Sequence, residues 1–271
     1  MSAHKEPSNQ GYDAVYQEFD SPLQRDLRSQ AYGKDIGQHS WVTVEDLDQD
    51  IVRLQICSTS CVLDLGCGPA GPLTYVVAQT ACHGIGADFS APAIASGEAR
   101  AKSQGLATRI ALQQADLNDP LPFATNSFDA VISLDVILHL RDRAKIFQEV
   151  ARVLTPGGKF LFTDAGVIAG PISNQQIRHR ALHGYTLFAP AGFNERMLDQ
   201  SGFRLLETAD RTPSLIKNAT GRLAARLARQ AELEQHEGEQ GFDGQQQYLK
   251  TIIDLAQKRS LLRMMYLAKK I

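Results

Sequence analysis

The chain has 271 residues, a formal net charge of -2 and an apolar fraction of 43%. A chain of this length suits one large α/β domain with a buried core. The near-neutral charge argues against a nucleic-acid protein that works through a broad basic face. No apolar stretch approaches the length of a membrane span, and the polar first residues contain no signal core. We therefore expect a cytoplasmic protein with no nucleic-acid or membrane partner.

Strand-like and helix-like segments alternate from residue 43 onward. Thr43 begins an expected helix, because Asp46 completes an approximate capping box three residues later. Apolar runs separated by helical segments predict strands over 61–65, 84–87, 109–115, 128–133 and 159–163. This alternation is typical of a parallel sheet with helices on both faces. Ligands of such sheets lie beyond the carboxyl ends of the strands, so we expect the chemistry in the loops that follow them.

The pattern changes beyond residue 164. Helices are expected over 171–185 and 191–201, and exposed polar helices over 220–258. Strand-like runs follow over 204–209 and 262–268. The chain shows no repeat and no domain boundary, which predicts one domain over 1–271. Its expected parts are an amino-terminal arm or lid (1–42), a core (43–165), a substrate cap (166–203) and a helical insertion (214–260). The insertion could cover the pocket or mediate formation of a homodimer.

The four cysteines are Cys57, Cys61, Cys67 and Cys82. They form no CxxC pair, and no nearby histidines supply the spacing of a zinc site. We therefore expect no metal, and thiols that stay reduced and mostly buried.

The most specific motif is the segment VLDLGCGPAG, residues 62–71. Its glycines let the backbone turn tightly after a strand and approach a nucleotide-like ligand closely. Gly66, Gly68 and Gly71 also fit the GxGxxG pattern of dinucleotide sites. Asp88 ends the second strand, where a carboxylate can bind ribose hydroxyls. These residues predict an adenosine-containing cofactor but do not choose between NAD and S-adenosylmethionine (SAM).

Two further carboxylates favour SAM. Asp64 lies at the end of the first strand, where it would repel an anionic pyrophosphate and attract a sulfonium and an ammonium. Asp116 follows the third strand, in a position to accept a hydrogen bond from an adenine amino group.

With the segments FDAVI (128–132) and LTPGG (154–158), residues 40–165 resemble the class I SAM-dependent methyltransferases. The resemblance implies a doubly wound, mostly parallel seven-stranded α/β sheet with a helical cap, in which 204–209 and 262–268 are the last strands. It also implies SAM as cofactor and S-adenosylhomocysteine (SAH) as product. The implied cofactor-binding residues are Asp64, Gly66, Cys67, Gly68, Gly71, Asp88, Phe89, Asp116, Leu117 and Ser133.

Three shorter segments resemble the phosphoethanolamine and sarcosine/dimethylglycine methyltransferases: YGKDIGQHSW (32–41), DVILHL (135–140) and YTL (185–187). This resemblance implies His139 as a general base or orienting group and Asp135 beside the reacting amine. The implied substrate residues are Tyr16, Tyr32, His183 and Tyr185. His183 stands where that group has a phosphate-holding basic residue, which disfavours phosphoethanolamine. Tyr12 and Tyr16 both lie near the place of that group's catalytic tyrosine.

The sequence thus predicts a methyltransferase that acts on nitrogen or oxygen of a small molecule. A C-methyltransferase of a natural product is an alternative, and it would need no strong base at His139. An NAD-dependent dehydrogenase would fit the glycine loop but would leave Asp64 and Asp116 unexplained. A noncatalytic SAM-binding protein would bind the cofactor without any transfer.

Overall fold

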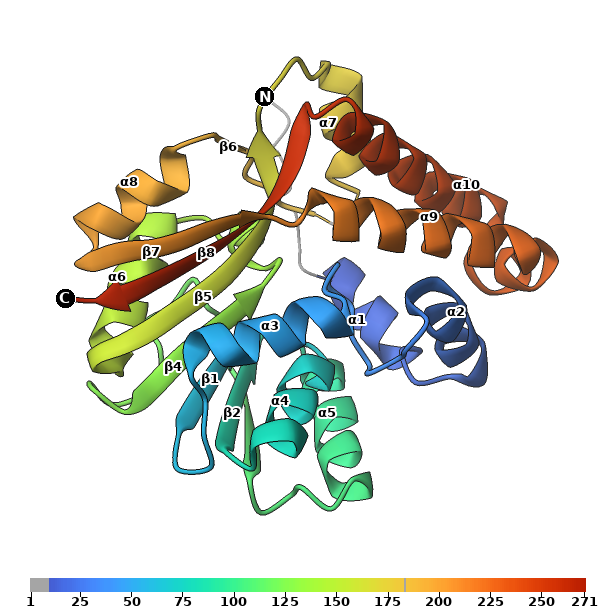
Figure 1. Ribbon diagram of the computed structural model, residues 1–271. Helices are drawn as coiled ribbons and strands as arrows, with labels where there is room; N and C mark the ends of the chain where they lie inside the picture. The colour runs from blue at the N-terminus through green and yellow to red at the C-terminus, as the bar shows by residue number, and fades with distance from the viewer. Residues whose placement is uncertain (1–9, 183) are drawn as a thin grey trace, which may run out of the picture.

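The computed structural model describes residues 10–182 and 184–271. In this part of the chain, strands form one sheet in the order β3-β2-β1-β4-β5-β8-β7, and the short β6 pairs with β5 (Figure 1). Among the described strands, β8 alone runs antiparallel to its neighbours. The strands are β1 (Cys61–Leu65), β2 (His83–Asp88), β3 (Ile110–Gln114), β4 (Phe128–Leu134), β5 (Leu154–Ile168), β6 (Ala189–Pro190), β7 (Phe203–Asp210) and β8 (Leu261–Lys270).

Helices join most of these strands and cover both faces of the sheet. They are α1 (Gln10–Gln17), α2 (Pro22–Tyr32), α3 (Val44–Leu54), α4 (Gly71–Thr80), α5 (Ala91–Ser103), the 3-10 turn η1 (Ile137–His139), α6 (Arg143–Val153), α7 (Asn174–Arg180), α8 (Phe193–Gln200), α9 (Thr212–Ala228) and α10 (Gln230–Gln257). Within α10 the backbone bends at Gly238, whose φ is 74°.

The predicted fold class is confirmed, with three local differences. The described chain has an eighth strand, the two-residue β6. The Pro156-Gly157-Gly158 segment lies inside β5, because Leu154 already pairs with Phe128 of β4. The helix expected over 171–185 spans only Asn174–Arg180. The chain after it hydrogen-bonds to η1 instead, where the Leu187 amide donates to the carbonyl of Leu138 at 2.7 Å.

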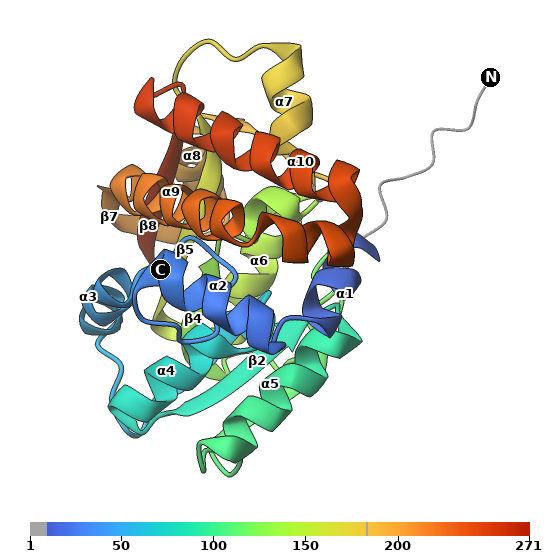
Figure 2. The same cartoon turned by 90° about the vertical axis from the view of Figure 1, so that its right-hand side faces the viewer.

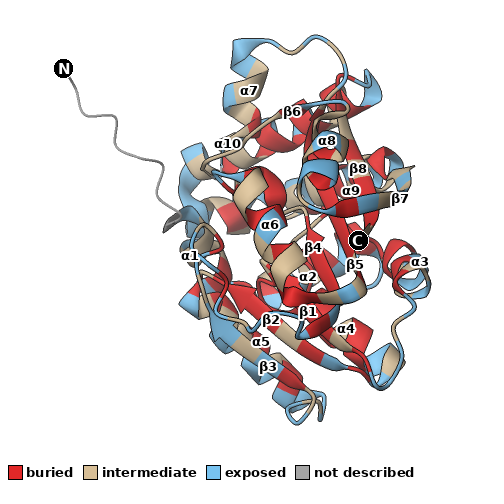
Figure 3. Ribbon diagram, turned by 90° about the vertical axis from the view of Figure 1, so that its left-hand side faces the viewer, coloured by how far each residue is buried: buried red, intermediate tan, exposed pale blue. Residues whose placement is uncertain are grey.

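The core has two layers because successive side chains of a strand point to opposite faces. On one face Leu63 and Leu65 of β1 pack with α6 and α8. On the other face Val62 packs with α3 and α4. Figure 3 shows the central strands mostly in the colour of buried residues and the outer surfaces of helices such as α5 exposed.

Four helices from the two ends of the chain lie together beside the carboxyl ends of the parallel strands. Helix α2 packs against α9, and α9 against α10. Figures 1 and 2 both show α1 and α2 between this α9–α10 pair and helices α4 and α5. The described helices include none that is long and apolar enough to cross a membrane.

Candidate active site

A cavity of about 650 Å³ lies at the carboxyl ends of β1, β2 and β4, under α1, α2, α9 and α10. This position is where open α/β sheets bind ligands. The sequence-predicted residues that line it are Tyr16, Asp64, Gly66, Cys67, Gly68, Asp88, Phe89, Asp116, Leu117, Asp135 and His139.

The glycine loop forms one wall of this cavity. Gly66 and Gly68 have φ values of 72° and 52°, a region that side chains disfavour. The amides of Gly66 and Cys67 donate to the carbonyl of Ala87 at 2.8 and 3.1 Å. The Gly68 amide donates to Asp88 Oδ2 at 2.9 Å. The loop after β1 is therefore hydrogen-bonded to the end of β2, at the cavity wall.

Two buried carboxyl groups, Asp64 and Asp88, flank this loop. Asp88 accepts hydrogen bonds from the amides of Gly68 and Ser90, each at 2.9 Å. Burial, together with the nearby Asp88, raises the pKa of Asp64 to about 8. At pH 7 the Asp64 carboxyl is thus mostly protonated in the ligand-free protein.

A cationic ligand next to Asp64 should reverse this protonation. An ammonium group would favour the carboxylate, so binding at pH 7 should release about one proton. Because the proton leaves on binding, affinity should increase as the pH rises from 6 to 8. Calorimetric titration with SAH in two buffers of different ionisation enthalpy measures the released proton. Asp64→Asn should abolish the release; equal heats in both buffers for the unchanged protein would contradict this role.

Gly71 begins α4 and does not line the cavity. A Cβ atom there would meet the backbone carbonyls of Ile36 and Gly37. Gly71 therefore allows the segment after α2 to pack against the glycine loop.

Gly71→Ala should displace residues 36–37 and lower the free energy of unfolding by about 1–3 kcal/mol, as overpacking does. Urea unfolding measures this change. Gly244→Ala is the matched control, because its Cβ would have only Leu182 nearby, at 3.9 Å. It should leave stability unchanged or raise it by about 0.5–1 kcal/mol, since Ala favours a helix over Gly.

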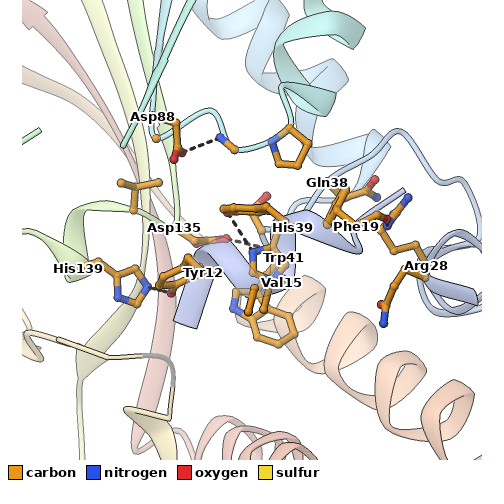
Figure 4. Close-up of a pocket in the computed structure, with 18 of the residues that line it drawn as sticks. Tyr12, Val15, Phe19, Arg28, Gln38, His39, Trp41, Asp88, Asp135 and His139 are labelled. Atoms are coloured by element: carbon orange, nitrogen blue, oxygen red, sulfur yellow. Dashed lines mark hydrogen bonds between the residues drawn. The ribbon is translucent and has the colours of Figure 1, made fainter. Parts of the chain in front are cut away.

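His139 and Tyr12 form a hydrogen-bonded pair in the cavity (Figure 4). His139 Nδ1 lies 2.9 Å from the carbonyl oxygen of Tyr185, and His139 Nε2 lies 3.1 Å from the Tyr12 hydroxyl. A carbonyl oxygen can only accept, which assigns the proton to Nδ1 and leaves Nε2 as the acceptor. Burial lowers the pKa of His139 to about 4 and raises that of Tyr12 above its usual value. At neutral pH the pair is therefore a neutral imidazole that accepts from a protonated phenol.

The sequence alone did not decide whether Tyr12 or Tyr16 of α1 is the partner of His139. Tyr16, one helical turn after Tyr12, lies 3.3 Å from His39 Nδ1 instead. A Cβ atom on Gly68 would lie 3.2 Å from its hydroxyl, so Tyr16 faces the glycine loop. Tyr12 is therefore the tyrosine beside His139, whereas the sequence-predicted site residues included Tyr16 and not Tyr12.

Asp135 lies at the cavity wall with its carboxylate already bound on both oxygens. Arg263 Nε donates to Oδ1 at 2.9 Å and to Oδ2 at 3.1 Å. The Thr163 hydroxyl donates to Oδ1, and the Trp41 amide to Oδ2, each at 2.8 Å. These contacts stabilise Asp135 in a backbone conformation with a positive φ of 62°. An amine beside this carboxylate would have to share it with Arg263.

Several predicted residues lie away from the cavity. The Ser133 hydroxyl is buried and donates to the carbonyl of Leu65 at 3.0 Å. The Tyr32 hydroxyl donates to the carbonyl of Ser40 at 3.1 Å. Tyr185 contributes its carbonyl to His139. The cavity lining includes none of these three residues. The prediction for His183 lies outside the described residues.

The cysteines and acidic clusters offer no site of their own. All four cysteines are free, and Cys67 is buried. Burial raises the pKa of the Cys67 thiol, which fits a packing role. The described residues contain no group of three or more histidine, cysteine or acidic side chains that could hold a metal ion.

Residues 63–162 match the sequence family described as "Methyltransferase domain". The chain is 29% identical to the methyltransferase GfsG of Streptomyces halstedii over 164 residues, which cover 58% of each chain. It is 32% identical to the glycine/sarcosine/dimethylglycine N-methyltransferase of Actinopolyspora halophila over 160 residues, 58% of this chain and 28% of that one. The match thus spans less than two thirds of the length of either relative.

Among solved structures, the fold matches phosphoethanolamine N-methyltransferase 2 of Haemonchus contortus, solved with phosphomonomethylethanolamine and SAH. The TM-score is 0.79 at 21% identity, over 96% of this chain and 60% of that one. The predicted resemblance to the class I SAM-dependent methyltransferases is therefore confirmed. Residues 63–162 match a methyltransferase domain, and the sheet that contains them has the fold of this solved N-methyltransferase.

Proposed function

We propose that this protein transfers a methyl group from SAM to a nitrogen or oxygen atom of a small molecule. The observation that carries the proposal is the position of the Tyr12–His139 pair in the same cavity as the carboxylate-flanked glycine loop. When bound, SAM supplies a methyl group that its sulfonium makes electrophilic. The chain has to align an acceptor, exclude water and accept a proton.

The glycine loop and its carboxylates fit this cofactor. Gly66 and Gly68 line the cavity, and Asp64 and Asp88 present buried acidic groups to a ligand with a sulfonium and an ammonium. The pyrophosphate of a dinucleotide would lack this match, because its negative charge disfavours the carboxylate form of both acids. In the solved Haemonchus contortus relative, the ligand SAH also supports SAM here.

Tyr12 and His139 are suited to move the acceptor's proton. The Tyr12 oxygen can accept a hydrogen bond from an acceptor hydroxyl or amine, while its own proton points to His139 Nε2. As the acceptor atom bonds to the methyl carbon, the methyl–sulfur bond of SAM would break and leave its electron pair on the sulfur of SAH, while the acceptor proton would pass to Tyr12 and the phenol proton to His139. The Tyr185 carbonyl then accepts from the imidazolium and stabilises its charge.

The test is methyl transfer from labelled SAM to a panel of small amines, phenols, hydroxy acids and phosphobases, with SAH binding measured alongside. Transfer to nitrogen or oxygen that requires His139 would support the proposal. SAH binding without transfer to any acceptor would favour a noncatalytic SAM-binding protein. Transfer to carbon that survives His139→Ala would favour a C-methyltransferase. Binding of NADH without displacement by SAH would contradict the cofactor assignment.

A further inference from the structure

Two groups of charged side chains line different sides of the cavity. Asp64 lies in β1, Asp88 ends β2 and Asp116 follows β3, on the side of α4 and α5. Arg180 of α7 and Arg222 of α9 line the cavity from the opposite side, and Figures 1 and 2 show these helices away from α4 and α5. The acidic side suits the cationic cofactor. A second, negatively charged ligand would therefore complement the positive charges of Arg180 and Arg222.

Arg180 is buried, with 4% of its surface exposed, and it forms no ion pair among the described residues. Its two hydrogen bonds, to the Tyr248 hydroxyl and the Ala165 carbonyl, are both long at 3.4 Å. Its Nε has no hydrogen-bond partner in the described part of the chain. A buried guanidinium without a carboxylate partner raises the free energy of the folded protein. The position of Arg180 therefore indicates that an anionic group of a ligand pairs with it.

The neighbouring arginines differ from Arg180 in their partners. Arg28 and Arg226 also line the cavity, but Arg28 pairs with Asp35 at 3.0 Å and Arg226 pairs with Glu237. Arg222 donates to the carbonyls of His39 and Ser40 and has no carboxylate within ion-pair distance among the described residues. Arg222 thus adds positive charge to the side of the cavity where Arg180 lies.

Arg180 lines the same cavity as Tyr12 and His139. Burial, and to a lesser extent the charge of Arg180, lowers the pKa of His139. The guanidinium lies 5.5 Å from the ring of Tyr248, which stacks on Trp41 with ring centroids 6.5 Å apart. Trp41 is the single tryptophan of the chain. The cavity lining also includes apolar side chains, among them Val15, Leu23, Leu27 and Leu249.

We propose that the methyl acceptor carries an anionic group, a carboxylate or a phosphate, on an apolar body, and that Arg180 binds this group beside Tyr12 and His139. The inference rests on the proposed function and narrows its substrate class. A guanidinium forms strong charge-assisted hydrogen bonds with both anions. The same charge disfavours an acceptor whose only charged group is a cationic amine.

The test measures binding of octanoate, octanamide and octyl phosphate by Trp41 fluorescence, with SAH held at saturation. In the unchanged protein, octanoate or octyl phosphate should bind about tenfold or more tightly than octanamide, as expected for charge-assisted hydrogen bonds. Whichever anion binds more tightly identifies the group. Arg180→Gln should weaken anion binding by about the same factor and change octanamide and SAH binding less than about twofold. Arg178→Gln, an exposed change on the same helix outside the cavity lining, should have no effect.

Equal binding of octanoate, octyl phosphate and octanamide to the unchanged protein would overturn the inference. Equal losses for all three probes, or weaker SAH binding, in Arg180→Gln would also overturn it, since Arg180 would then support the fold or the cofactor. If Arg180→Gln does not fold, Arg180→Lys replaces it, because lysine retains the charge. The comparison of octanoate, octyl phosphate and octanamide binding to the unchanged protein still tests the inference. Failure of SAH to bind that protein would instead contradict the proposed function.

Discussion

Tyr12→Phe is expected to lower kcat by about 10²-fold or more, which is the usual contribution of a positioned acid–base group. The change removes only the hydroxyl that lies 3.1 Å from His139 Nε2 and leaves the ring against Phe89. His139→Gln should have a similar effect, because it removes the acceptor of the phenol proton. The measurement is single-turnover transfer to an acceptor identified by the panel, with SAH affinity unchanged in both variants.

The two residues should act as one unit. The double variant Tyr12→Phe/His139→Gln should be no slower than the single variants, as is typical of groups that share one step. Tyr75→Phe is the matched control, since Tyr75 donates to Asp48 on the surface at 2.8 Å and lies outside the cavity lining. Multiplicative losses in the double variant, or a loss in the control, would contradict a shared proton path.

The low pKa of His139 also predicts the pH profile. With SAM saturating at every pH and an acceptor that does not titrate, kcat/KM for the acceptor should stay constant from pH 8 down to about 5 and fall only as the pH approaches 4, where the imidazole becomes protonated. A histidine with its ordinary pKa would lose activity near pH 6.5. An inflection at that pH that disappears in His139→Gln would show that the imidazole is more solvated than the structure indicates.

Features of the site that are local to the ends of single strands could be predicted from the sequence. The glycine loop and Asp88 are local to strand ends, and parallel strands bring their carboxyl ends to one edge of the sheet. The structure accordingly places Gly68 and Asp88 in direct contact. The two-residue strand β6 has no detectable pattern, since its pairing depends only on β5.

Contacts between distant segments could not be predicted in the same way. Tyr12 and Tyr16 lie on one face of α1 because they are four residues apart. The choice between them depends on how α1 docks beside the sheet, and Tyr12 lies 127 positions from His139. Asp135 was expected beside the reacting amine. Its partner Arg263 lies 128 positions away, within an apolar strand that contains no local sign of an ion pair.

Arg263→Met is expected to lower the free energy of unfolding by about 3–5 kcal/mol, the usual cost of removing one partner from a buried ion pair. Arg263 is completely buried in β8 and binds Asp135, Thr163 and, more distantly at 3.4 Å, Asp46. Without it, the carboxylate of Asp135 remains in the interior, and its donors among the described residues are the hydroxyl of Thr163 and the amide of Trp41. Thermal unfolding should show a melting temperature lower by about 6–20 °C.

Asp135→Asn in the Arg263→Met background should recover part of this loss, because the uncompensated charge is then absent. Arg259→Met is the matched control: Arg259 is an exposed arginine paired with Asp210 at 2.9 Å, and its loss should cost at most about 1 kcal/mol. Equal losses at Arg263 and Arg259 would mean that the buried pair contributes no more than a surface pair. A recovery in the double variant would instead show that Arg263 chiefly neutralises the buried charge of Asp135. Asp135 in turn connects Trp41 to the sheet at the edge of the cavity.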